Sequence, residues 1–223
     1  MNFNISEYPG SYLAVELKKG EKLITEKGSL IYCDGEYSFE NKIEAKSYKN
    51  WIAKVFEGKS LTYNIYTAKE DLKMAFSTKE NAEIFNIDIS DENPILFEPH
   101  LHFARSINLS IQLEKKDWKS TLNDGLKLKT NGNGTLFLKG YGKIISQEID
   151  TDKPIYVDED ALIAFENRLD VKTVSKGLKE LITSGEGFLF AIKGKGKIWL
   201  QTREKSEQSS GGGLIDGVFN FVK

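Results

Sequence analysis

Apolar and polar positions alternate in three stretches of the chain, and each stretch is followed by a polar corner and a second apolar stretch. The alternating positions are Leu13, Val15 and Leu17, then Phe85, Ile87 and Ile89, then Ile145, Gln147 and Ile149. The polar corners span 18–21, 90–94 and 150–154, and the apolar stretches after them begin at Leu23, Ile95 and Ile155. Alternation with a period of two predicts β-strands. Its recurrence predicts three tandem repeats, at about residues 8–80, 81–143 and 144–205.

The second half of each repeat is predicted to contain a crossover and a hairpin. Apolar residues recur at three- and four-residue spacing within 42–56 and within 174–182, which predicts short crossover helices. The middle crossover, within 115–130, contains Asn123-Asp124-Gly125 and is predicted to be a loop or a short turn. In the third repeat, glycines at 194 and 196 predict a hairpin turn over 193–197.

Together these patterns predict an all-β protein with a single domain over residues 1–208, built from three stacked repeats with short helices in the crossovers. The end of the chain differs, because 209–223 reads as a glycine-rich tether followed by an apolar segment. The apolar residues of that segment are Leu214, Ile215, Val218, Phe219 and Phe221.

The apolar C-terminal segment and Trp51 are the candidate interface residues. The segment is too short to hold a helix alone in water, so we expect it to dock on its own subunit or on a neighbour. Contact with a membrane or with a separate protein partner is the alternative. Exposed strand ends favour homo-oligomerisation, and we expect a trimer.

The charge of the chain argues against a nucleic-acid partner. The formal net charge is −2, and Arg105, Arg168 and Arg203 are the only arginines, so DNA is not expected. Lys193, Lys195 and Lys197 beside Trp199 offer a single-stranded RNA surface, although a soluble turn is the favoured interpretation.

The single cysteine, Cys33, excludes a disulfide within the chain and indicates a reducing compartment. It lies in an apolar run and is expected to act as a small buried hydrophobic residue. Residues 1–8 lack an apolar signal core, and no run approaches the roughly 20 apolar residues of a membrane span. We therefore expect a cytoplasmic protein.

The strongest candidate for chemistry is the pair His100 and His102. Alternate histidines on one strand would point to the same face, as in metal-binding β-helix enzymes. These are the only histidines, however, and the nearest glutamate that follows is Glu114. We expect no metal and no cofactor. Serine or cysteine triads, phosphate loops and catalytic carboxylate pairs are not evident, and we expect no catalytic residues.

Several short motifs carry a family resemblance. They are the stretch 155–165, Gly185-Glu186-Gly187-Phe188, Leu200-Gln201-Thr202-Arg203, and the opening 13–32 with Gly20-Glu21 and Gly28-Ser29-Leu30-Ile31. Over about residues 10–205 the chain resembles the altered inheritance of mitochondria protein 24 family. The resemblance implies a fold like the tryptophan-RNA-binding attenuator superfamily, which is a short double-stranded β-helix or sandwich. It also implies assembly, because members of that superfamily form rings or compact oligomers. It implies no catalytic residues. The crossovers 42–56 and 115–130, and the two histidines, depart from the family pattern.

From these observations we expect a non-enzymatic homo-oligomeric scaffold or binding module. One alternative is a small-ligand or single-stranded RNA binder. A further alternative is a metal-dependent enzyme that uses His100 and His102.

Overall fold

The computed structural model describes residues 1–6, 10–43, 62–114, 127–174 and 189–204, and these residues form an all-β structure, as predicted. Within these ranges the one helical element is a 3₁₀ turn, η1 (Pro99–Leu101). Most residues of the predicted crossover helices, together with Trp51 and the apolar C-terminal segment, lie outside the described ranges.

The strands fall into three segments along the chain, preceded by β1 (Asn2–Ile5). Segment 12–77 holds β2 (Tyr12–Leu17), β3 (Lys22–Glu26), β4 (Leu30–Asp34), β5 (Tyr37–Ile43), β6 (Thr62–Ala68) and β7 (Leu72–Ser77). Segment 83–140 holds β8 (Glu83–Ile89), β9 (Ile95–Phe97), β10 (His102–Ser106), β11 (Ser110–Leu113), β12 (Leu128–Asn131) and β13 (Gly134–Gly140). Segment 144–201 holds β14 (Ile144–Asp158), β15 (Leu162–Glu166), β16 (Asp170–Val174) and β17 (Leu189–Gln201).

Antiparallel pairing follows the same order in all three segments. The opening strand pairs with the closing strand, as in β2 with β7, β8 with β13, and residues 144–151 of β14 with 194–201 of β17. On its other side the closing strand pairs with β4, β10 or β15. The remaining strands form a second group, in which β3 and β5 flank β6, and β9 and β11 flank β12. Residues 155–158 of β14 and strand β16 likewise flank 189–193 of β17.

A bulge recurs at the same place in β4, β10 and β15. The register shifts between Leu30 and Tyr32, between His102 and Ala104, and between Leu162 and Ala164. A bulge places one extra residue in a strand and strengthens its local twist. Pairing with the closing strand continues on both sides of each bulge, so the bulge bends the strand within its own pair.

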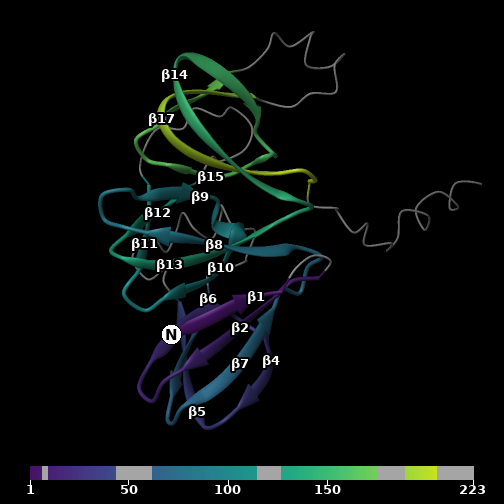
Figure 1. Cartoon of the computed structure of the whole chain (residues 1–223), viewed down its shortest axis with the longest axis vertical. Helices are drawn as coiled ribbons and strands as arrows, with labels where there is room; N and C mark the ends of the chain where they lie inside the picture. Colours follow the sequence, from purple (N-terminus) through teal and green to yellow (C-terminus); the bar gives the residue numbers. More distant parts are fainter. Residues whose placement is uncertain (7–9, 44–61, 115–126, 175–188, 205–223) are drawn as a thin grey trace, which may run out of the picture.

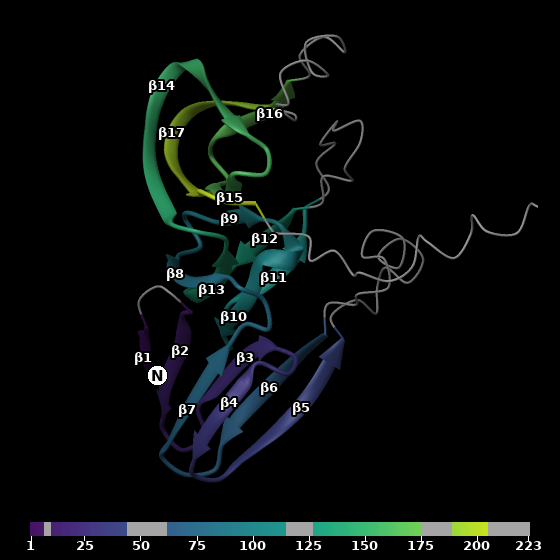
Figure 2. The ribbon, with the colours of Figure 1, turned by 90° about the vertical axis from the view of Figure 1, so that its right-hand side faces the viewer.

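The segments join through backbone pairing as well as side chains. Strand β3 pairs with β10 and makes a six-stranded sheet in the order β5-β6-β3-β10-β13-β8. Strand β9 pairs with β15 in the same way. The three segments therefore lie in sequence along the long axis of the molecule, with β4 toward one end and the curled β14 at the other (Figures 1 and 2).

Three apolar clusters fill the interior, and side chains from a neighbouring segment complete them. Phe103 and Ala104 of the middle segment pack in the cluster of segment 12–77. Ile163 and Ala164 of the last segment pack in the cluster of the middle one. The first two segments therefore each depend on the following segment for part of their core, and the last takes Leu96 from the middle one.

Two predicted corners are wrong in the last segment, where β14 and β17 run without a break through 150–154 and 193–197. The two strands bend together as a pair, as Figure 2 shows, so that β17 pairs with β15 in one half of its length and with β16 in the other. Gly194, with φ of 108°, faces Thr151, and the β14 register shifts between Thr151 and Ile155. Because pairing resumes beyond the bend, glycine here permits a change of strand direction rather than a hairpin.

Truncation of Phe103 should destabilise the protein strongly, because its fully buried ring closes the junction between two segments. We expect Phe103→Ala to lower the free energy of unfolding by about 3–5 kcal/mol, measured by urea denaturation. Phe39→Ala is the control, since Phe39 is 60% exposed, and it should cost less than about 1 kcal/mol. Equal losses in the two variants would contradict the assigned packing.

Candidate functional site

The two histidines singled out from the sequence do not lie on one strand face. His100 lies in η1 with its side chain half-exposed, and its Nδ1 is 3.3 Å from Oε2 of Glu98. His102 begins β10 and is buried, with 3% of its surface exposed. The proline that opens η1 replaces the extended geometry expected for alternate residues. The shared strand face predicted for His100 and His102 is therefore wrong.

The His102 ring lies in an aromatic and cationic environment. Tyr63 packs against it edge-on with ring centroids 4.7 Å apart, and Phe97 stacks at 6.3 Å. Arg105 lies over the Tyr63 ring at 4.8 Å and donates from Nη1 to Nε2 of His102 at 3.1 Å. Because guanidinium only donates, the neutral imidazole carries its proton on Nδ1. That buried atom has no hydrogen-bond partner among the described residues.

The environment of His102 strongly disfavours its protonation. Burial is the main cause, and the nearby cations Arg105 and Lys139 add to it, so the pKa of His102 lies well below its ordinary value. A neutral, enclosed imidazole of this kind serves packing and accepts a hydrogen bond. It offers no proton transfer to a solvent-borne substrate near neutral pH.

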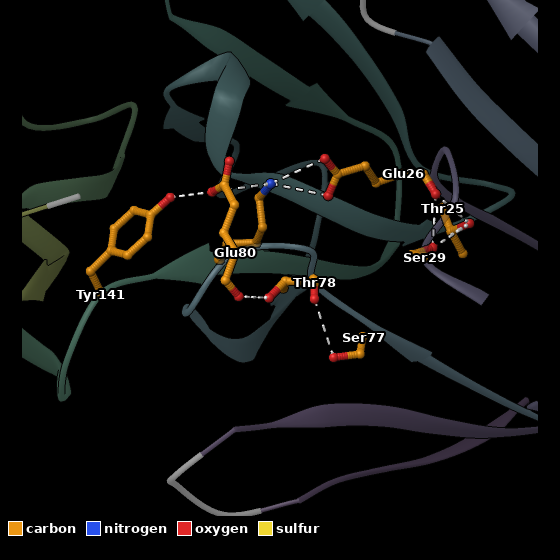
Figure 3. A network of polar contacts seen from close by, with 8 residues as sticks. Thr25, Glu26, Ser29, Ser77, Thr78, Glu80 and Tyr141 are labelled. Carbon is orange, nitrogen blue, oxygen red and sulfur yellow. Dashed lines mark hydrogen bonds and ion pairs between the residues drawn. The ribbon is translucent and has the colours of Figure 1, made fainter. Parts of the chain in front are cut away.

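A buried lysine holds the first two segments together. Lys139 on β13 places Nζ 3.0 Å from Oε2 of Glu26, which ends β3, and 3.8 Å from Oε2 of Glu80. The Tyr141 hydroxyl donates to Glu80. Tyr141, Glu80 and Glu26 lie across the junction between the segments (Figure 3). Burial, reinforced by the Glu80 carboxylate, raises the pKa of Tyr141, so the phenol stays protonated.

A second buried lysine lies near the junction between the second and third segments, but its ion pair is within the middle segment. Lys127, just before β12, is buried and places Nζ 2.6 Å from Oε1 of Glu98, which follows β9. Its ammonium group crosses to the third segment only through the Phe190 ring, whose centroid is 5.6 Å away. Burial, with the carboxylates of Asp160, Asp158 and Glu98, raises the pKa of Glu159.

The lysines proposed as an RNA surface are paired with acids. Lys193 lies 3.7 Å from Asp170, and Lys195 lies 3.0 Å from Asp150. Lys197 lies 3.6 Å from Glu148 and over the Trp199 ring at 5.7 Å. The three lysines lie within the continuous strand β17, so they do not form a positively charged hairpin tip.

Cys33 and a cleft near the N-terminus also bear on function. Cys33 is partly buried against the first core, and burial raises the pKa of its thiol. This pKa direction disfavours a reactive thiolate. Near the N-terminus, a cleft of about 490 Å³ is lined by charged residues that pair with one another, such as Lys18 with Asp71 at 2.7 Å.

The described residues thus bring together structural ion pairs rather than a catalytic constellation. Within them, no group of three metal-ligating side chains lies close enough to hold an ion. Sequence reasoning missed Lys139 and Lys127. A signal for Lys139 was present, because it is a lone charge in the apolar strand Leu136-Phe137-Leu138-Lys139.

Large apolar side chains remain exposed at the two ends of the described structure. Ile31 and Tyr32 on β4 are 62% and 54% exposed, and Tyr156 in the second half of β14 is 61% exposed. Each lies on a strand that pairs on one side only among the described strands. These edges are the candidate binding surfaces of the protein.

Removal of the buried ammonium group should weaken the junction between the first two segments. Lys139→Met leaves Glu26 and Glu80 without their cation, and we expect the free energy of unfolding to fall by about 1–3 kcal/mol in urea denaturation. Lys73→Met removes an exposed pair with Glu16 and should change it by less than about 1 kcal/mol. A Lys139→Met variant as stable as the native chain would contradict this role.

His102 should make stability depend on pH in the acidic range. Its folded-state pKa lies below the ordinary value of 6.5, so the unfolded chain binds more protons. Its contribution is complete above about pH 6.5 and is lost as the pH falls toward the folded-state pKa, with a slope of up to about 1.4 kcal/mol per pH unit. His102→Leu should remove this component; Leu30 and Leu162 hold the corresponding positions before the bulges. Identical pH profiles of unfolding free energy for the two proteins would disprove it.

No helix among the described residues has the length and hydrophobicity needed to cross a membrane.

Comparison with known proteins identifies the fold and the family. The structure is similar to that of protein SPYM3_0169 from Streptococcus pyogenes, with a TM-score of 0.72 and 20% sequence identity, covering 91% of this chain and 94% of that chain. At this identity the likeness shows the fold alone. No curated protein matches the sequence. The family model described as mitochondrial biogenesis AIM24 matches residues 3–203. Since this match spans nearly the whole chain and agrees with the resemblance found in the sequence, the protein belongs to the AIM24 family.

Proposed function

We propose that this protein is a non-enzymatic homo-oligomeric scaffold built from three tandem β repeats, the segments 12–77, 83–140 and 144–201. The recurrence of one pairing order and one bulge position in all three segments supports the repeat. Repeats of this kind bury a core by stacking on their neighbours. The terminal repeats of an array therefore leave apolar side chains exposed and strand edges unpaired.

The use of the buried charges supports a structural role. Lys139 binds Glu26 across the junction between the first two segments, Lys127 binds Glu98 within the middle segment, and His102 accepts a hydrogen bond inside the core. Catalysis requires polar groups whose pKa values are matched to proton transfer and which face a substrate. The two groups whose pKa values shift most, those of His102 and Tyr141, are buried in packed protein instead.

The observation that carries the proposal is the exposure of Ile31, Tyr32 and Tyr156 on strands with an open edge. Open, apolar edge strands associate readily, and proteins that stay monomeric usually protect them with charges or a covering loop. An edge that is used for assembly has no need of that protection.

Native mass provides the test. We expect light scattering of the full chain at micromolar concentration to give a discrete multiple of the 25.2 kDa chain mass, with three copies as our expectation. The association should persist in high salt, because burial of apolar edges is less sensitive to ionic screening than pairing of surface charges. A mass of one chain at every concentration would refute the scaffold proposal.

A further inference from the structure

Two junctions inside the chain show how one segment binds the next. The strand β3 of the first segment pairs with β10 of the second, with Ile24 opposite Arg105 and Thr25 opposite Ala104. The strand β9 of the second pairs with β15 of the third, with Leu96 opposite Phe165 and Phe97 opposite Ala164. The two registers coincide. In each junction the alanine that ends the bulge, Ala104 or Ala164, lies opposite the second residue of the pair, Thr25 or Phe97. The chain therefore uses one type of junction twice.

Each terminal segment presents one of the two strand edges of this junction without its partner strand. Residues 155–158 of β14 pair with β17 as β3 pairs with β6 and as β9 pairs with β12. Strand β4 pairs with β7 as β10 pairs with β13. Within the described structure neither of these strands has a partner on its other edge. The first segment thus presents a β10-type edge, and the last presents a β3-type edge.

We propose that copies of this chain join head to tail through these two edges, β4 of one copy pairing antiparallel with residues 155–158 of the next. This inference rests on the proposed homo-oligomeric function and identifies its interface. The internal registers place Tyr156 opposite Cys33 and Val157 opposite Tyr32. The resulting sheet would repeat the six-strand order found between the first two segments.

The side chains at the two edges are those that the internal junctions bury. Phe103 and Ile163 follow the first residue of their bulged strands and pack into the core of the preceding segment. Ile31 has the same position in β4 and is 62% exposed, since no described strand pairs with the other edge of β4. In a head-to-tail pair Ile31 would enter the core that contains Phe190 in the neighbouring copy.

The opposite edge shows the matching pattern. Ile24 and Leu96 are the central residues of their strands, and each packs into the core of the segment that follows. Tyr156 has the same position and is 61% exposed. The core that follows in a head-to-tail pair is the one against which Cys33 packs. The two edges are therefore complementary to each other and not to themselves.

Proline before the terminal strand does not block this pairing. Pro154 precedes 155–158 just as Pro94 precedes β9. At the internal junction the Pro94 carbonyl accepts a hydrogen bond from the Asn167 amide at 2.9 Å. A proline at this place thus keeps its acceptor within the ladder although it lacks an N–H.

Because the contact joins two different edges, it is heterologous and continues from copy to copy. A heterologous contact produces a closed ring if the rotation between copies completes a turn, and otherwise a filament. An isologous pairing of two β4 strands would instead stop at a dimer. The number of copies joined therefore separates the two arrangements.

The native cysteine provides a direct test on the full-length protein. Directly opposed residues of antiparallel strands have Cα atoms about 4.5–5.5 Å apart, within the range that a disulfide spans. We expect Tyr156→Cys to form a disulfide with Cys33 of the next copy under mild oxidation. Non-reducing gels should show a ladder beyond the dimer, and peptide mass spectrometry should identify the 33–156 linkage.

Two controls accompany the crosslinking variant. Tyr156→Cys combined with Cys33→Ser should lose the ladder, since only the head-to-tail register joins the two positions. Val157→Cys should crosslink far less, because adjacent residues of a strand point to opposite faces. Dimers linked through two copies of position 156 would overturn the inference, as would equal crosslinking at 156 and 157.

A charge at the same interface gives an independent measurement. Ile31→Lys should weaken association by about 100-fold or more, because an unpaired ammonium group would enter the neighbouring core. Ile145→Lys, at a 41% exposed isoleucine in the first half of β14, should leave the native mass unchanged. Circular dichroism and thermal unfolding confirm that both variants fold.

The outcomes separate this inference from the proposed function. An oligomer that survives Ile31→Lys and gives no 33–156 linkage would overturn the head-to-tail interface while retaining the scaffold. A native chain that is monomeric throughout would remove both. A ladder in the crosslinking variant together with dissociation by Ile31→Lys would support both.

Discussion

Pairing of a strand edge from one segment with a strand edge from the next is the constraint on which the rest of this structure depends. The first two segments each split their strands between two sheets, so that β3 and β9 would end a sheet with unpaired amide and carbonyl groups. The next segment satisfies those groups and supplies side chains such as Phe103 to the preceding core. Hydrogen bonding and apolar burial therefore require the same contact, and neither segment can satisfy it alone.

The buried Lys139 adds specificity to that contact. Its ammonium group can meet Glu26 only when β3 and β13 lie in their observed sheet. A buried ion pair contributes little net stability, because desolvation offsets much of its attraction. A misaligned junction would remove Glu26 from the buried ammonium group, and loss of one partner of a buried ion pair is destabilising. We infer that this pair selects the register rather than drives the packing.

Local pattern predicted some elements well and others poorly, for identifiable reasons. Leu13, Val15 and Leu17 alternate with polar residues, and all three are buried as that pattern requires. The turn at 193–197 was wrong because a glycine-rich stretch suits a tight turn and a bent strand equally well, and only the partner strand distinguishes them. The prediction that His100 and His102 share a strand face was wrong for a similar reason, since Pro99 opens a 3₁₀ turn where alternation implied extended backbone.

The sequence by itself determined the all-β class, strands with clear alternation such as Tyr12–Leu17, and membership of the AIM24 family. These follow from local chemistry, because side-chain alternation and turn residues act within a few positions of the chain. Only the tertiary structure decided which edges pair, where Lys139 finds Glu26 across 113 positions, and which apolar residues stay exposed. Such properties arise from contacts between distant residues, and period-two alternation is the same in a strand with one partner as in a strand with two.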